Sequence, residues 1–531
     1  MAATVLLLLA ASGLRAGGRL AGGAQQSGRR NLIMVATAPV GSPRTDAIRI
    51  RGSKLAVADA LPLRIEGQWY DVSGWADEHP GGRWLLEYAR GRDVTALFRA
   101  IHLRNEGVAS AALSRLPQLH ASELPLPSSS GLPPSALQAE GALQGEYVFS
   151  YGSPPASPPL PPIDSALRSE LRAMLRREFP DVGAAKATAG HWVRTALALA
   201  GTLACWAGWL GGSLPATAAL PLVHWVLIAH TVHEATHGNL STDPRINYWF
   251  QFTSHPICFN VFVWIPQHLL SHHQYTNDFL HDADCHHFAP AMLSSTQPRV
   301  QPLKPGFNHG WTFVWKAFLT TIGTSLLQPM RTLLESATPN YEVNVTPVPA
   351  AVSKPQLLLS VLPSFFVLLY PLVGAAGGAF SLPQAAFLWA WPWVGMSLIF
   401  TCMTQVSHVQ AATQPDAPGG GASATCWTSR QIAASLDYSV PAGPTGRASP
   451  LEMSVVTALS AGLNVQSLHH AMPSVGCAHF PRLYAEYAAI CDRHGVRLRQ
   501  SDNAATAVGE MLRYVFDNNA PEAARADRTA G

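Results

Sequence analysis

Hydrophobic and polar positions separate a mixed-polarity front part of the chain from two long apolar stretches. No Asp, Glu, Lys or Arg occurs between Arg194 and Glu234, and none occurs between Lys354 and Asp416. Each stretch is divided by a short break that contains glycine and proline. A transmembrane helix needs about 20 mostly apolar residues, so each stretch has room for two helices joined by a turn. The pattern therefore predicts four spans in two hairpins.

The two breaks, 211–215 and 374–383, also predict an orientation. Neither contains Lys or Arg, whereas basic residues flank both hairpins on the other side. Loops rich in Lys and Arg stay on the cytoplasmic side of a membrane. We therefore expect everything except the two breaks to be cytoplasmic. The shorter apolar segment around 250–265 is expected to be interfacial or re-entrant.

The segments around the hairpins differ in composition. Residues 47–120 mix polar and apolar positions with turn signals and predict a small soluble domain, and 121–163 form a Pro/Ser-rich linker. Residues 164–179 have the helical period, with Asp164 and Ser165 as capping residues, and begin a membrane domain over 164–520. Residues 1–46 hold five arginines but no acidic residue before Asp46, which fits a targeting segment or a disordered tail equally well. Residues 521–531 are expected to be a disordered tail.

Composition narrows the class further. The chain has 531 residues, 13% of them charged and 48% hydrophobic, which favours a multidomain membrane protein. A net charge of +3 is too small to indicate a nucleic-acid partner. The seven cysteines lack C-x-x-C spacing and are expected to be free thiols in a reducing compartment. The 21 histidines are clustered, so histidine chemistry is the feature to explain.

Three histidine boxes lie next to the predicted hairpins: HEATH at 233–237, QHLLSHH at 267–273 and QSLHH at 466–470. The first box places two imidazoles four residues apart, on one face of a helix, which is metal-ligand spacing. One more histidine follows the last span. Eight histidines predicted on one side of the membrane suit two first-row metal ions, with iron favoured. The candidate ligands are His233, His237, His268, His272, His273, His408, Gln466, His469 and His470.

The boxes, their order and the intervening hairpin resemble the membrane fatty acid desaturase family. Gln466 at the head of the third box is similar to the front-end branch, and the three residues between His268 and His272 are similar to delta-5 and delta-4 enzymes. The resemblance implies a di-iron centre, with no catalytic residue separate from it. It also implies O2-dependent introduction of a cis double bond toward the carboxyl end of a long-chain polyunsaturated acyl chain. Delta-5 or delta-4 chemistry is favoured, and delta-6 remains open.

A second constellation runs through WYDVSGWADEHPGG, 69–82, and GRDVTALFRAIH, 91–102. The Pro-Gly-Gly turn after His79 lets the backbone approach a flat ligand closely. Alone, such a turn is more often a plain surface turn. In context the segment resembles cytochrome b5, which implies haem b with His79 and His102 as axial ligands and an electron-transfer role. The first helix that is usual in that family is not evident before Leu61.

The fold class predicted from these observations is mainly α. A small α+β cytochrome b5-like haem domain is followed by a four-helix, two-hairpin membrane domain with a cytoplasmic histidine-rich cap. The resemblance implies a long-chain acyl lipid or acyl-CoA as substrate, O2 as co-substrate and cytochrome b5 reductase as electron source. An endoplasmic-reticulum membrane is favoured, and a plastid remains possible.

Several alternatives remain open. A sphingolipid delta-8 desaturase or a fatty-acyl hydroxylase would use similar boxes. A membrane-anchored haem carrier would not need them, and a zinc protease would use HEATH with Glu234 as general base. The histidines at 281–287 are interpreted as part of a polar loop, and His230 as a packed or supporting residue.

Overall fold

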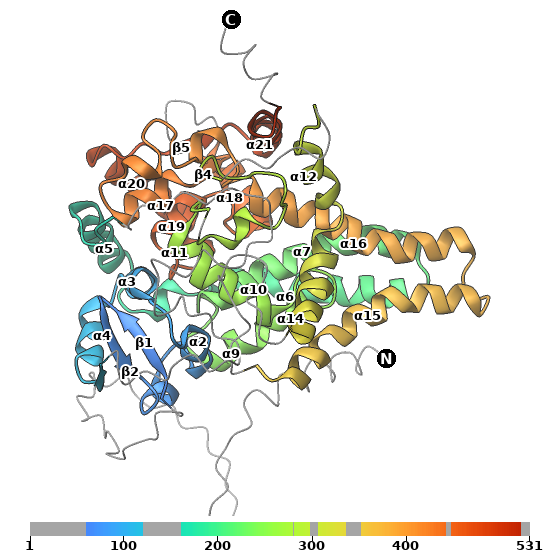
Figure 1. The fold of residues 1–531 in the computed structure, drawn as a ribbon, viewed down its shortest axis with the longest axis horizontal. Coiled ribbons are helices and arrows are strands. Elements are labelled where there is room, and N and C mark those ends of the chain that lie inside the picture. The colour runs from blue at the N-terminus through green and yellow to red at the C-terminus, as the bar shows by residue number, and fades with distance from the viewer. Residues whose placement is uncertain are drawn as a thin grey trace, which may run out of the picture.

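The computed structural model describes residues 60–120, 161–279, 281–297, 306–335, 352–441 and 448–521. The predicted targeting segment, most of the predicted linker and almost all of the predicted tail lie outside these residues, so the predicted domain boundaries stay predictions. Within the described residues the protein is mainly helical, with one small sheet near the start and a short strand pair in the cap (Figure 1). The predicted fold class is confirmed.

The first described unit is a small α+β module, blue in Figure 1. Its antiparallel sheet has the order β1 (Pro62–Ile65), β2 (Gln68–Asp71) and β3 (Gln118–Leu119). Glu66 and Gly67 join β1 to β2 with φ of 54° and 80°, the left-handed pair that a two-residue hairpin turn requires. The helices that cover the sheet are η2 (Ala76–Glu78), α2 (Arg83–Ala89), α3 (Thr95–Ile101) and α4 (Glu106–Leu113).

Four helices are long and apolar enough to cross a membrane, and they form the two predicted hairpins. The first hairpin pairs α6 (Ala189–Leu210) with α7 (Leu214–Ile228), which continues through η7 (Ala229–His233) and α8 (Glu234–Thr236). The second pairs α15 (Lys354–Ala376) with α16 (Leu382–Gln405). All four extend from one side of the molecule (Figure 1).

Polar contacts complete the ends and the junction of the hairpins. Thr188, Ser213, Ser353 and Ser381 cap the four helices with side chains that accept backbone N–H groups of the first turn. These caps replace hydrogen bonds that water cannot supply next to a bilayer. Between the hairpins, the buried Trp209 donates from Nε1 to the carbonyl of Leu388 at 2.9 Å.

The remaining elements form a cap at one end of the hairpins.

The helix predicted over 164–179 is α5 (Ala166–Glu178), and the side chain of Ser165 accepts the backbone N–H of Arg168 at its start. The segment around 250–265 does not span; it folds into short helices and a connecting loop within the cap. The cap elements are α5 (Ala166–Glu178), η6 (Gly183–Ala185), α9 (Pro244–Phe250), η8 (Gln251–Ser254), α10 (Val261–Pro266), η9 (Gln267–His272), α11 (His273–Tyr275), η10 (Ala283–Cys285), α12 (Gly310–Ala317), α13 (Thr320–Ile322), η11 (Gly323–Leu327), α14 (Gln328–Glu335), η12 (Ala411–Thr413), η13 (Gly421–Ser423), α17 (Trp427–Ala433), β4 (Leu436–Tyr438), α18 (Pro450–Ser460), α19 (Gln466–Ala471), η14 (Cys477–His479), α20 (Phe480–Arg493), β5 (Arg499–Ser501) and α21 (Ala504–Asn518).

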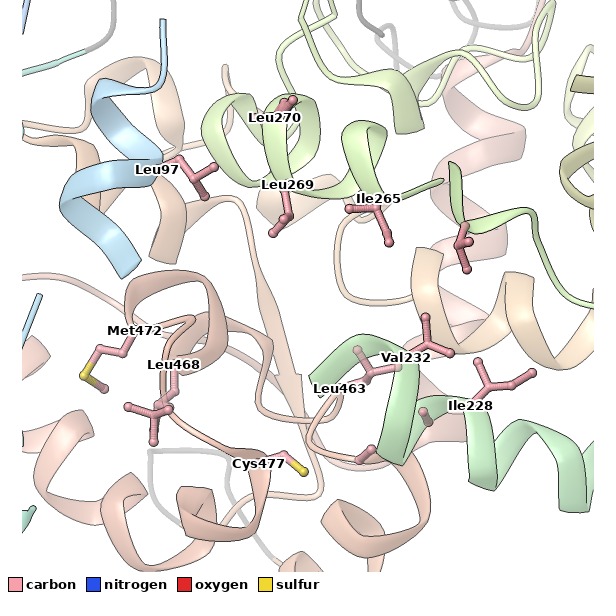
Figure 2. Packing of buried hydrophobic residues seen from close by; sticks show 14 of the residues in the cluster. Leu97, Ile228, Val232, Ile265, Leu269, Leu270, Leu463, Leu468, Met472 and Cys477 are labelled. Atoms are coloured by element: carbon pink, nitrogen blue, oxygen red, sulfur yellow. The ribbon is translucent and has the colours of Figure 1, made fainter. Parts of the chain in front are cut away.

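The haem-type module is seated on the cap and shares its hydrophobic core. Buried side chains of both units form one continuous cluster, in which Leu97 of the module faces Leu269 and Leu270 of the cap (Figure 2). A buried ion-pair group adds to the contact. The carboxylate of Glu106 in α4 accepts from Arg168 at 2.9 Å and from Arg172 at 2.6 Å, both in α5. The module therefore packs directly against the cap, in addition to being covalently connected to it.

Candidate metal centre and haem cavity

The second box lies up to His272 in a π-helical turn, η9, and the first box begins at His233, the last residue of another π-helical turn, η7. Such turns have i→i+5 hydrogen bonds and are frequent at functional sites. In η9 the π turn brings residues five apart onto one face: His268 and His273 have their Nε2 atoms 3.1 Å apart. An α-helix would place them about 140° apart around its axis. The third box starts α19, an ordinary α-helix.

The first ligand group contains five buried histidines, each with a ring nitrogen within 4.8 Å of the other four. The Nε2 atom of His268 lies 3.0 Å from that of His237, and the Nε2 of His273 lies 3.2 Å from that of His469. A neutral imidazole has one N–H and one lone pair, so one ring nitrogen cannot donate to all its neighbours. Converging lone pairs of this kind fit a shared cation. The group is His233, His237, His268, His273 and His469.

The second group contains His272, His408 and His470, again with ring nitrogens within 4.8 Å of one another. The side-chain amide of Gln466 completes it, with its nitrogen 3.1 Å from His408 Nε2 and 3.2 Å from His470 Nε2. The amide oxygen of Gln466 is buried and has no hydrogen-bond partner among the described residues. A 180° rotation of this amide about its last side-chain bond exchanges the nitrogen and the oxygen, so that the oxygen can bind a cation.

Hydrogen bonds outside the ligand atoms distinguish the two groups. In the second group, the Nδ1 of His272 lies 3.1 Å from Asp282, that of His408 donates to the carbonyl of Ala434 at 3.0 Å, and that of His470 to Gln431 at 2.9 Å. Each bond keeps the proton on Nδ1 and leaves Nε2 free for metal. In the first group, the Nδ1 atoms of four rings are buried without a hydrogen-bond partner in the described part of the chain: His233, His237, His273 and His469.

The electrostatics keep most of these rings neutral. Burial, followed by the neighbouring imidazoles, lowers the pKa of His237, His273 and His469 far below its usual value. Burial and then His272 lower the pKa of His408 to about 3. A metal binds the neutral ring, so these groups are ready for a cation at neutral pH.

His272 is the exception. Burial lowers its pKa, but Asp282 and Asp284 outweigh burial and raise the pKa to about 9. These carboxylates were not among the predicted site residues, because 281–287 was interpreted as a polar loop, and that interpretation is wrong for Asp282. That side chain is fully buried, and besides His272 it accepts the backbone N–H of Asn277 at 2.8 Å. The sequence signal for this contact was the position of Asp282, ten residues after the box histidine His272.

A cavity of about 60 Å³ adjoins both ligand groups. Its polar wall includes ligand-group residues, namely His233, His268, His272, His408 and Gln466. Asp284 and His287, from segment 281–287, also line it. Its apolar wall comes from both the hairpins and the cap, and the hairpins contribute Trp225, Ile228, Ala229 and Phe400. An apolar wall beside a metal-ligand cluster suits an acyl chain.

A larger cavity, of about 300 Å³, lies in the haem-type module. His79 and His102 line it with ring centroids 6.4 Å apart. Their Nδ1 atoms donate to the carbonyls of Gly82 and Phe98, which leaves both Nε2 atoms free. Burial and then His102 lower the pKa of His79 to about 4, and burial lowers the pKa of His102. Trp75, Leu85, Leu97 and Phe98 line the cavity as apolar walls.

Glycine is needed at the edge of this cavity. A Cβ on Gly81 would lie 2.8 Å from Cε1 of His79 and 2.9 Å from Cδ1 of Leu85, closer than side chains tolerate. Any larger residue would displace the histidine that faces the cavity. The residues present therefore fit a flat, bis-histidine-ligated haem.

The opposite wall of the haem cavity belongs to the cap. It includes Lys186, His237, Leu269 and Leu270. His237 is also a member of the five-histidine group. The two candidate cofactor sites therefore share a wall, which the sequence analysis did not anticipate.

Comparisons with known proteins agree with this geometry. The family model described as "Fatty acid desaturase" matches residues 212–502, and the one described as "Cytochrome b5-like Heme/Steroid binding domain" matches residues 59–131. The chain is 27% identical over 471 residues to "Acyl-lipid omega-13 desaturase" of Chlamydomonas reinhardtii, covering 85% of this chain and 92% of the relative. It is 27% identical to "Acyl-lipid (7-3)-desaturase, chloroplastic" of the same organism, covering 85% and 79%. It is 23% identical to "Acyl-lipid (8-3)-desaturase" of Mortierella alpina, covering 86% and 93%.

Proposed function

Because this chain belongs to the fatty acid desaturase family and carries a fused cytochrome b5 module, we propose that it introduces a cis double bond at the delta-5 or delta-4 position of a long-chain polyunsaturated acyl lipid. It is a front-end acyl-lipid desaturase that uses haem, a di-iron centre and O2. The observation that carries the proposal is the convergence of the five-histidine and the three-histidine groups beside one apolar cavity. Relatives named for omega-13, (7-3), (8-3) and 6-desaturation differ in bond position, so the walls of this cavity are where the position is decided.

Each ligand group would hold one iron ion. The five-histidine group would hold the first, and His272, His408, His470 and Gln466 would hold the second. When bound, the two ions supply the O2-derived oxidant that removes two hydrogens from adjacent unactivated carbons. Among the chain's own residues, Asp282 holds the Nδ1 proton of His272, and the apolar wall orients the acyl chain and excludes water.

The haem module would be the source of electrons for the reaction. His79 and His102 would hold the haem iron, and the bound haem would supply electron transfer. Cytochrome b5 reductase would be the electron source of the module. The wall that contains His237 lies between the haem cavity and the five-histidine group.

The cap and the haem module would face the cytoplasm, because the Lys/Arg-free turns of the hairpins lie at the opposite end of the spans. An endoplasmic-reticulum membrane is the favoured location, and a plastid is the alternative, which the chloroplastic relative supports. The acyl carrier would be a lipid, as in the names of the relatives, with acyl-CoA as the competing carrier.

The test is fatty-acid profiling of yeast that expresses the chain. Cultures are fed polyunsaturated acids of eighteen, twenty and twenty-two carbons, and products are located by gas chromatography–mass spectrometry. The control is His469→Ala, which lies outside the haem cavity and should keep the haem spectrum. A new double bond on the carboxyl side, absent in the control, supports the proposal and gives the position. A hydroxylated product would move the protein to the hydroxylases, and a change confined to sphingoid bases would indicate delta-8 chemistry.

A further inference from the structure

A third cluster of metal-binding side chains lies outside both cofactor sites. His191, His230 and Cys477 each place one ligand atom within 4.8 Å of the other two, and all three residues are buried. They come from α6, η7 and η14, segments that are far apart in the sequence. Figure 2 shows Cys477 opposite the end of the helix that carries Val232.

Hydrogen bonds to the backbone fix both imidazoles in one tautomer. The Nε2 of His191 donates to the carbonyl of His230 at 2.9 Å, and the Nε2 of His230 donates to the carbonyl of Ala458. Both Nδ1 atoms therefore carry lone pairs. Histidine ligands in metalloproteins are held in the same way by a bond from their other ring nitrogen.

Neither of these Nδ1 lone pairs has a short hydrogen bond among the described residues. The Nδ1 of His230 is buried and makes no hydrogen bond within the described residues. The Nδ1 of His191 lies 3.9 Å from Sγ of Cys477, a long contact for a hydrogen bond. Tetrahedral zinc would separate a nitrogen and a sulfur ligand by about 3.6 Å, given its usual bond lengths.

The adjacent Glu234 is the independent observation that points to a cation. It is fully buried, and its Oε2 accepts the backbone N–H of Cys477 at 3.0 Å. Its Oε1 has no hydrogen-bond partner among the described residues, and the ion-pair contact found there is with His233 Nδ1, at 3.8 Å. A buried carboxylate is costly when one of its oxygens has no hydrogen bond, and the interactions with Cys477 and Lys186 offset only part of that cost. A divalent cation would balance this carboxylate and one thiolate.

We propose that His191, His230 and Cys477 bind a structural zinc ion beside the buried carboxylate of Glu234. Two nitrogens and one sulfur form a donor set that suits Zn²⁺. Binding releases the thiol proton of Cys477 to solvent. The ion would connect the first hairpin to the segment that follows the third box. It would thereby stabilise the position of η7, which carries the box residue His233. The site is separate from the iron ligands and does not depend on which bond the enzyme desaturates.

The test is metal analysis of the purified full-length protein from cells supplied with both iron and zinc. Mass spectrometry counts the metals, absorbance counts the haem, and zinc-edge X-ray absorption identifies the ligands. The wild type should hold about one zinc per chain, with a sulfur neighbour at about 2.3 Å. Cys477→Ser should lower zinc content at least about tenfold with iron and haem unchanged, because the thiolate is the strongest ligand. Cys491→Ser, at another buried thiol, is the matched control and should keep the zinc.

His191→Gln provides a second variant and should also lose zinc. Because no cysteine belongs to the two iron-ligand groups, a sulfur neighbour distinguishes this site from zinc misplaced into the iron centre. Zinc without a sulfur neighbour, zinc that persists in Cys477→Ser, or a wild-type protein that holds iron and haem but no zinc would overturn the proposal.

Discussion

His102 and His237 line the same cavity, although one belongs to the haem module and the other to the first histidine box. On the cap side, the wall of this cavity includes Leu269 and Leu270 from the second box region. The relative placement of the two candidate cofactor sites is therefore set by packing.

Loss of the carboxylate behind His272 should weaken the second metal site. In Asp282→Asn, the amide no longer accepts fully from Nδ1 or supplies negative charge, and iron affinity should fall about 10–100-fold. Iron per haem in the purified protein measures this. Asp278→Asn, whose carboxylate pairs with Arg430 at 3.1 Å, is the control and should keep its iron. Equal iron loss in both variants would contradict a specific role for Asp282.

Removal of the charge at Glu106 should loosen the docked module. Glu106→Gln leaves Arg168 buried without its main partner, and breaking a buried pair costs about 3–5 kcal/mol. The haem spectrum should be unchanged, while reoxidation of reduced haem by O2 with substrate present should slow at least about tenfold in stopped-flow absorbance. Glu66→Gln is the control, because Glu66 pairs with Arg99 at a half-exposed position. An unchanged rate in Glu106→Gln would show that these pairs do not hold the module.

Haem uptake by the apo-protein should be insensitive to mild acid. Burial and then His102 lower the pKa of His79 to about 4, so this ring stays neutral when the pH falls from 7.5 to 5.5. A ring with the ordinary pKa of 6.5 would bind a proton in that window and lose about tenfold in affinity. Haem titrations at both pH values, followed by the Soret band, should agree within about threefold. A tenfold loss at pH 5.5, with the protein still folded, would mean that the ligand titrates normally.

Enlarging the acyl cavity should change specificity. Phe400 lines the cavity that adjoins the ligand groups, so Phe400→Ala should admit longer or misplaced chains and broaden the product profile. Phe313→Ala, the control, removes another buried ring that does not line it. Both variants should lose about 3–5 kcal/mol of stability. Product ratios from mixed acyl feeds separate the effects, and equal ratios in the two variants would place the acyl chain elsewhere.

Much of this architecture follows from local pattern. The charge-free stretches predict the hairpins, and the boxes predict which side chains converge, because both depend on short-range sequence. The capping role of Ser165 was also predictable, since an N-cap bonds within its own first turn.

The missed features depend on contacts between distant segments. Glu106 and Arg168 are ordinary surface residue types, and only the docking of α4 on α5 buries them together. Asp282 was treated as part of a polar loop because its burial depends on how that loop folds back over η9. The meeting of His191 with Cys477 likewise depends on the assembled cap.

The π turn at Gln267–His272 changes what the length of a histidine box means. His273 lies five positions after His268, and the wider turn still lets both rings reach one metal-ligand group. A relative with one residue fewer between these histidines needs an ordinary α turn to present the same nitrogen atoms. Box length would then also report the local helix type.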